Sequence, residues 1–168
     1  MNTLIKYAKI ELVPTRRVQE LYPKVCFETL SEICNILYNS WVPSTARPLM
    51  INHKIKLQLL KGKNNRKKFD GLCYTDSNLI EINPKMPFNR FFKCIIHEFR
   101  HWYQSKYLGI TMTPYSIACQ LSDSTYLDLP EEKDANSLEE IYEEILFTYT
   151  TIKSLKQIAT HYTKFSPN

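Results

Sequence analysis

The segment from residue 88 to residue 107, FNRFFKCIIHEFRHWYQSKY, constrains the fold of this chain more than any other stretch. His97 and His101 are four positions apart in it, and each residue of an α-helix advances about 100° around the axis. A helix therefore places both imidazoles on one face, about one turn apart. The residues just before the histidines are largely apolar and predict that this helix is buried: Phe91, Phe92, Cys94, Ile95 and Ile96.

The two histidines have the spacing of a metal site. Two imidazole nitrogens one helical turn apart can bind a single zinc ion at about 2.0–2.1 Å. Glu98 flanks the same face, where its carboxylate can take a proton from an attacking water and deliver one to a leaving amine. HEFRH thus predicts a zinc-dependent hydrolytic centre with His97 and His101 as ligands and Glu98 as the catalytic base. The alternative is an amphipathic helix that contains the pattern by chance.

A catalytic zinc site has three protein ligands and one open position. The longer motif with a third histidine is absent, because Gln104 and Tyr107 follow the pair. The segment LPEEKDANSLEE contains the candidate third ligand, Glu132, on a helical stripe with Ala135, whose small side chain would let two helices approach closely. Glu131 is the competing ligand. The acidic turn could also do no more than complement the positive end of the helix dipole.

Two further residues are candidates for supporting roles. Catalysis by such a site uses a proton donor to the oxyanion of the tetrahedral intermediate. Tyr142 falls on the stripe of the candidate third ligand and is the first choice, with Tyr149 and His161 as alternatives. The competing interpretation of Tyr142 is a buried core tyrosine. Gln104 is one turn after His101 and is expected to support that ring with a hydrogen bond.

HEFRH and the later EKDAN together resemble the compact zincin metallopeptidases of the gluzincin type. The similarity is greatest to the ImmA/IrrE-like and related short phage-encoded proteins, whose second motif has the form ExxA followed by Asn. It covers residues 70–150 approximately. The resemblance implies a zinc-dependent peptidase that acts on a protein or peptide, with Glu132 as third metal ligand. The matching residues are His97, Glu98, His101, Glu132, Ala135 and Asn136.

The remaining patterns predict a single α+β domain over residues 1–168. We expect a small, mainly antiparallel three-stranded sheet packed against the HExxH helix and a glutamate-bearing C-terminal helix. By resemblance to zincins, residues 78–84 would be an edge strand that pairs with substrate; an ordinary solvated edge is the alternative. The expected elements are helix 24–41, strand 49–59, hairpin strands 69–75 and 78–84, helix 88–107, an irregular segment 108–130, and a helix starting near Pro130.

The net charge of +5 includes a basic run, KGKNNRKK, from Lys61 to Lys68. Such a run can contact phosphates weakly or can form an ordinary solvated loop. It motivates a second hypothesis, a nucleic-acid-associated zincin-like protein that is either SprT-like or non-catalytic. A third hypothesis is a metal-containing interaction module without activity. The intact Glu98 argues against that one, because a structural site has no use for this carboxylate.

The sequence also bears on location. No stretch approaches the roughly 20 apolar residues of a membrane span, and Lys6 and Lys9 interrupt the N-terminal segment where a signal peptide would be apolar. The five cysteines lack CxxC spacing and indicate reduced thiols. We therefore expect a cytoplasmic protein without membrane contact. His53 lies on the apolar face of its strand and is interpreted as a packed core residue.

Overall fold

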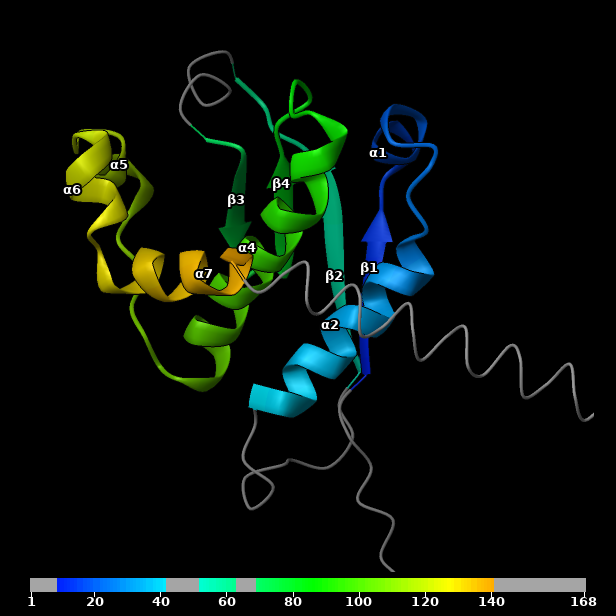
Figure 1. Cartoon of the computed structure of the whole chain (residues 1–168), viewed down its shortest axis with the longest axis horizontal. Coiled ribbons are helices and arrows are strands. Elements are labelled where there is room, and N and C mark those ends of the chain that lie inside the picture. The colour runs from blue at the N-terminus through cyan, green and yellow to red at the C-terminus, as the bar shows by residue number, and fades with distance from the viewer. Residues whose placement is uncertain (1–8, 42–51, 63–68, 141–168) are drawn as a thin grey trace, which may run out of the picture.

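The computed structural model describes residues 9–41, 52–62 and 69–140, which form an α+β fold (Figure 1). The strands are β1 (Lys9–Pro14), β2 (Asn52–Leu59), β3 (Gly71–Tyr74) and β4 (Leu79–Ile82), in the order β1-β2-β4-β3. The helices are α1 (Arg16–Leu21), α2 (Phe27–Trp41), α4 (Phe88–Tyr107), α5 (Tyr115–Ala118), α6 (Asp123–Leu127) and α7 (Pro130–Glu140).

The sheet differs from the expected three-stranded, mainly antiparallel one. It has four strands, with β1 parallel to β2, β2 parallel to β4, and β3 antiparallel to β4. Parallel neighbours need a crossover of about a dozen residues or more, usually a helix, and α2 supplies it between β1 and β2. The alternating pattern of a strand indicates which face is buried. It does not indicate the partner strand, and the parallel pairings depend on contacts far apart in the sequence.

The expectation that residues 78–84 form an edge strand is wrong. The predicted hairpin is present, but β4 is its interior strand, between β2 and β3. Glu81 of β4 is buried. Two hydrogen bonds to its carboxylate offset the cost of this burial, one from Gln58 Nε2 at 2.7 Å and one from the Tyr74 hydroxyl at 3.2 Å. The edge of the sheet on this side is therefore β3.

The two edges of the sheet have different surroundings. On the β1 edge, Asn35 of α2 accepts a hydrogen bond from the Ile10 backbone N–H at 2.5 Å and donates one to the Ile10 carbonyl at 3.1 Å. Ser31 accepts from the Leu12 N–H at 2.9 Å. These contacts cover an edge that could otherwise pair with another chain. Among the described strands, β4 alone pairs with β3, so the other side of β3 has no strand partner in the part of the chain that the structure describes.

The hydrophobic core lies between the sheet and the helices α2 and α4. Helix α4 has the bounds predicted from the sequence, and its buried face includes the polar residues Glu98, His101 and Gln104. Gly109, with a φ of 65°, takes the left-handed conformation that commonly ends a helix. The core side chains from both layers include Ile10, Leu30, Ile33, Leu57, Ile80, Ile82, Phe91, Ile95 and Phe99.

Three other expectations can be compared with the structure. Helix α7 begins at Pro130 as predicted, and residues 108–130 contain the short helices α5 and α6 within an otherwise irregular path. His53 is half-buried and packs edge-on against Trp102, with 4.9 Å between ring centroids, while its Nε2 lies 2.6 Å from the Tyr107 hydroxyl. His53 is therefore packed, as interpreted, but it lies at the margin of the core instead of inside it. None of the described helices is long and apolar enough for a bilayer crossing.

Candidate metal centre

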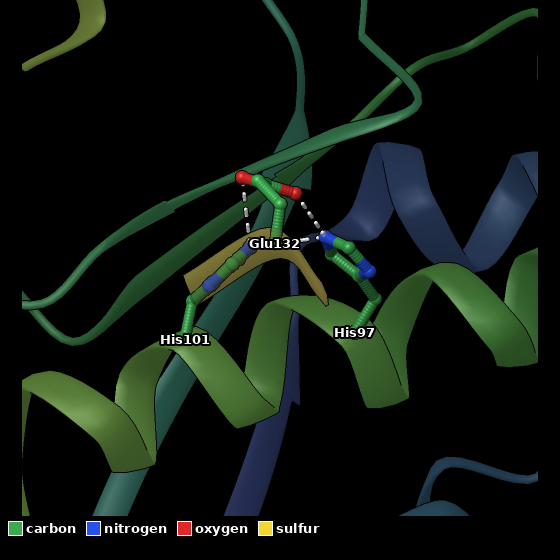
Figure 2. Close-up of side chains that lie close together, drawn as sticks. All are labelled: His97, His101 and Glu132. Carbon is green, nitrogen blue, oxygen red and sulfur yellow. Dashed lines mark hydrogen bonds and ion pairs between the residues drawn. The ribbon is translucent and has the colours of Figure 1, made fainter. Parts of the chain in front are cut away.

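Helix α4 brings the two histidines together at the surface that faces α7 (Figure 2). The His97 and His101 rings stand nearly perpendicular, with an interplanar angle of 84°, and their Nε2 atoms are 2.9 Å apart. The His101 ring is buried and the His97 ring nearly so. The one-turn spacing read from the sequence therefore directs both nitrogens to one point.

Glu132 completes the cluster from α7. One carboxylate oxygen lies 3.1 Å from His97 Nε2 and the other lies 3.3 Å from His101 Nε2. Zinc–ligand bonds of about 2.0–2.1 Å in a tetrahedron separate the ligand atoms by about 3.3 Å. The donor set of two imidazoles and one carboxylate, with all ligand atoms within 4.8 Å of one another, therefore fits a zinc ion closely.

The close approach of α7 to α4 depends on a small residue and a charged pair. Ala135 is fully buried at 0% exposure, where α7 lies against α4. Arg100, the residue just before His101, donates two hydrogen bonds to Asp134 of α7, at 2.6 and 3.1 Å. The Arg100 guanidinium also lies 4.6 Å from the centre of the Trp41 ring. Paired and stacked in this way, Arg100 holds α7 in register with α4.

Gln104 orients the His101 ring, as expected from its spacing. The Gln104 side-chain amide donates to the Glu131 carbonyl at 3.0 Å and to Asp134 at 2.6 Å. Its oxygen must therefore face His101 Nδ1, at 2.9 Å, and accept a hydrogen bond from it. This contact puts the proton of a neutral His101 on Nδ1 and leaves the lone pair of Nε2 directed at the cluster.

The carboxylates around the two histidines shift the pKa values of the whole cluster. The second nitrogen of His97, Nδ1, is 3.1 Å from Glu139, within ion-pair distance but without hydrogen-bond alignment. Burial lowers the pKa of His97, but Glu132 and Glu139 beside the ring outweigh it and raise the pKa to about 10. Burial raises the pKa of Glu132, but the two histidine rings outweigh it and hold this pKa well below its usual range.

Glu98 lies beside the three converging groups and is not one of them. Its carboxylate is buried between α4 and β3, and burial raises its pKa against the opposing effect of His97. The backbone of Gly71 in β3 approaches so closely that a Cβ there would lie 2.9 Å from Glu98 Oε1 and 2.7 Å from Cys94 Sγ. A glycine at this position therefore makes room for the Glu98 side chain.

The structure distinguishes Glu132 from Glu131, which the sequence left as competitors. Glu131 Oε1 accepts hydrogen bonds from the Thr113 backbone N–H at 3.1 Å and from the Thr113 hydroxyl at 2.5 Å. It fastens the segment before α5 to α7. Its neighbour Glu132 points at the two histidines instead.

Tyr126 is a site residue that the sequence did not indicate. It lies on α6, and its hydroxyl donates to Glu132 Oε1 at 2.5 Å. Burial, together with Glu132, raises its pKa well above the usual range, so the hydroxyl keeps its proton. The surrounding SDSTYLDLP has no periodic pattern that could have signalled this role.

The other candidate residues lie outside the part of the chain that the structure describes. Tyr142, Tyr149 and His161 follow the last described residue, and residues 63–68 contain most of the basic run. The roles suggested for them remain predictions.

No protein-family profile matches the chain, and comparisons with curated proteins and with solved structures find no significant match. The functional argument therefore depends on the geometry of the site and on the motifs themselves.

The choice of third ligand can be tested by a matched pair of substitutions. Glu132→Ala should lower zinc affinity by more than about 100-fold, because losing a hydrogen-bonding partner of a ligand alone costs about 10–100-fold. Glu131→Gln, which keeps an oxygen facing Thr113, should leave zinc affinity within a few-fold of wild type. Zinc content by mass spectrometry and chelator competition measure both. Equal loss in the two variants would contradict the assignment.

Zinc binding at pH 7 should release at least one proton per chain. In the metal-free chain a ring with a pKa of about 10 is protonated at pH 7, and it must lose this proton before its nitrogen binds a metal. Two rings with an ordinary pKa near 6.5 would together release only about half a proton. Zinc affinity should accordingly rise with pH through the neutral range. Calorimetry in buffers of different ionisation enthalpy counts the protons, and a release near one half would show that His97 is neutral before binding.

Proposed function

We propose that the chain is a zinc-dependent hydrolase that cleaves peptide bonds. The observation that carries this proposal is the convergence of His97, His101 and Glu132 at zinc-ligand spacing, with Glu98 buried next to them. A purely structural zinc site would be closed by a fourth protein ligand. Among the described residues the cluster offers three candidate ligands. A hydrolytic zinc centre has three protein ligands and leaves the fourth position open for water.

Each residue of the site has a task in this chemistry. His97, His101 and Glu132 would hold the zinc, which would supply a Lewis acid that lowers the pKa of a water and polarises a carbonyl. Glu98 accepts the proton of the attacking water and transfers it to the nitrogen of the leaving amine. Its raised pKa makes the carboxylate a stronger base toward the attacking water. The protonated Glu98 is still a much stronger acid than the ammonium of the leaving amine, so it can pass the proton on.

We assign to Tyr126 the role of proton donor to the oxyanion. The sequence suggested Tyr142 first for this role, and because Tyr142 lies outside the described residues that suggestion stays a prediction. The protonated hydroxyl of Tyr126 is aimed at Glu132 Oε1, at the edge of the cluster and on the wall of the adjoining cavity. By turning its single O–H away from Glu132, this hydroxyl can donate a hydrogen bond to the oxygen on which negative charge develops during attack.

A peptide is the substrate that best suits the surroundings of the site. The open edge strand β3 lies directly beside Glu98 through Gly71. An extended peptide could therefore add to the sheet next to the base, with its backbone hydrogen-bonded to β3. The β1 edge is covered by α2 and lies at the opposite side of the sheet. The nucleic-acid hypothesis has no support among the described residues and stays a prediction from the basic run.

Replacement of the base tests the proposal directly. Glu98→Gln should keep the fold and about one zinc per chain, since Glu98 is not a ligand, but should lower peptide cleavage by about 10²–10⁴-fold. Turnover of an internally quenched peptide by the zinc-loaded full-length protein measures the loss. Undiminished cleavage by Glu98→Gln would eliminate Glu98 as the base.

Tyr126→Phe separates transition-state stabilisation from substrate binding. The variant keeps the ring and loses the hydroxyl that bonds to Glu132, so zinc affinity should fall by about 10–100-fold. With zinc at saturation, kcat should still fall by about 10²–10³-fold while KM changes little. Steady-state kinetics on the same peptide give both constants. If KM rises and kcat is unchanged, Tyr126 contributes to binding instead of to the reaction.

A further inference from the structure

The candidate metal centre opens into a cavity of about 370 Å³. Its floor includes Glu98 and His101 of α4; β3 forms one side, and the segment from Met112 to Ala118 forms the other. In Figure 1 the helices α5 and α6 lie beside β3, at the open edge of the sheet. The volume is within the roughly 300–1,000 Å³ usual for ligand pockets.

An aromatic wall connects this cavity to the metal centre. The Phe69 ring contacts the Tyr115 ring at 5.6 Å and the Tyr126 ring at 5.8 Å, between centroids. Tyr126 then reaches Glu132 through its hydroxyl. On the β3 side, Tyr74 also lines the cavity. Tyr115 and Tyr74 are 38% and 40% exposed, so the cavity presents large aromatic surfaces to solvent within reach of the reacting groups.

The charges of the cavity limit what it can bind. Among the described residues that line it, the carboxylates are Asp76, Glu98, Glu131 and Glu132, with no lysine or arginine. An acidic side chain would be placed among like charges and would lose its hydration. A basic side chain would gain little, because Glu132 faces the two histidines, Glu131 is bonded to Thr113, and Glu98 is the proposed base. A large apolar side chain would cover the exposed aromatic rings.

A second, smaller cavity of about 150 Å³ lies on the His97 side of the centre. It shares Phe69, Gly71, Glu98, Tyr126 and Glu132 with the first cavity. Its lining is more polar and includes Arg90, which pairs with Asp70 at 2.7 Å, together with Asn136 and Glu139. The base and the metal ligands thus lie where two unlike cavities meet, and a bound chain can continue on both sides.

We propose that the larger cavity is a specificity subsite for one bulky apolar side chain, and that the protein cleaves internal peptide bonds next to such a residue. The smaller cavity receives the polar or small residue across the bond. This inference rests on the proposed peptidase function and adds the class of substrate.

The cleavage preference is read from digestion of a denatured protein by the zinc-loaded full-length chain, with the cut sites mapped by mass spectrometry. Phe, Tyr, Leu or Met should be enriched at least about tenfold over Ala on one side of the cut bond, and Asp and Glu should be depleted there. Cuts should occur within the chain. Cleavage without side-chain preference, or removal of terminal residues only, would overturn the proposal.

Binding gives a readout that does not depend on turnover. In the zinc-loaded Glu98→Gln protein, a terminally blocked fluorescent peptide with a central Phe should bind at least about fivefold more tightly than the same peptide with Ala or Glu. Tyr115→Ala should remove most of this difference. Ile117→Ala is the matched control, because Ile117 is 51% exposed on the same short helix and does not line the cavity.

The two readouts separate failure of the subsite from failure of the proposed function. Selective binding of the Phe peptide with no cleavage by the wild-type protein would support the subsite and refute the peptidase. Cleavage with equal binding of the three peptides, or equal effects of Tyr115→Ala and Ile117→Ala, would refute the subsite and leave the peptidase standing.

Discussion

The contact between α4 and α7 is the interaction on which the candidate site depends. Two histidines one turn apart are supplied by α4 alone, but the carboxylate that completes the cluster arrives from a helix about 30 residues later. Ala135 brings the helices close, and the Arg100–Asp134 pair sets their register. A larger residue at position 135 would move Glu132 away from the rings, and a tetrahedral site tolerates little displacement of a ligand.

Burial gives the same residues both structural and chemical roles. Gln104 has a fully buried side chain that is bonded to His101, Glu131 and Asp134 at once, so it joins the two helices and also sets the tautomer of a candidate ligand. Glu98 is buried under the backbone of Gly71, and this burial moves its pKa toward the range of a useful base. Polar groups are expensive to bury unless they are hydrogen-bonded or paired, and a fold retains such groups mainly where they have a use. Their concentration on one face of α4 therefore marks the site.

The prediction of the site from the sequence was strongest where chemistry and geometry are local. The spacing of His97 and His101 within one helix determines their relative position, and the structure directs both Nε2 atoms to one point as expected. The choice between Glu131 and Glu132 could not be made in this way, because both fall in the first turn of α7. It depends on how that helix is rotated against α4. Tyr126 was missed because its contact with Glu132 is a property of the irregular path between the helices.

The sequence by itself determined the buried helix from residue 88 to residue 107, its pair of histidines, the β3–β4 hairpin and the start of α7 at Pro130. Each of these follows from a periodicity or a turn residue within a short window. Only the tertiary structure decided the strand order and the choice of β3 as the open edge. It also decided which residues surround the candidate ligands. Strand pairing and helix docking join segments that are distant along the chain, and a local pattern of apolar residues contains no information about its partner.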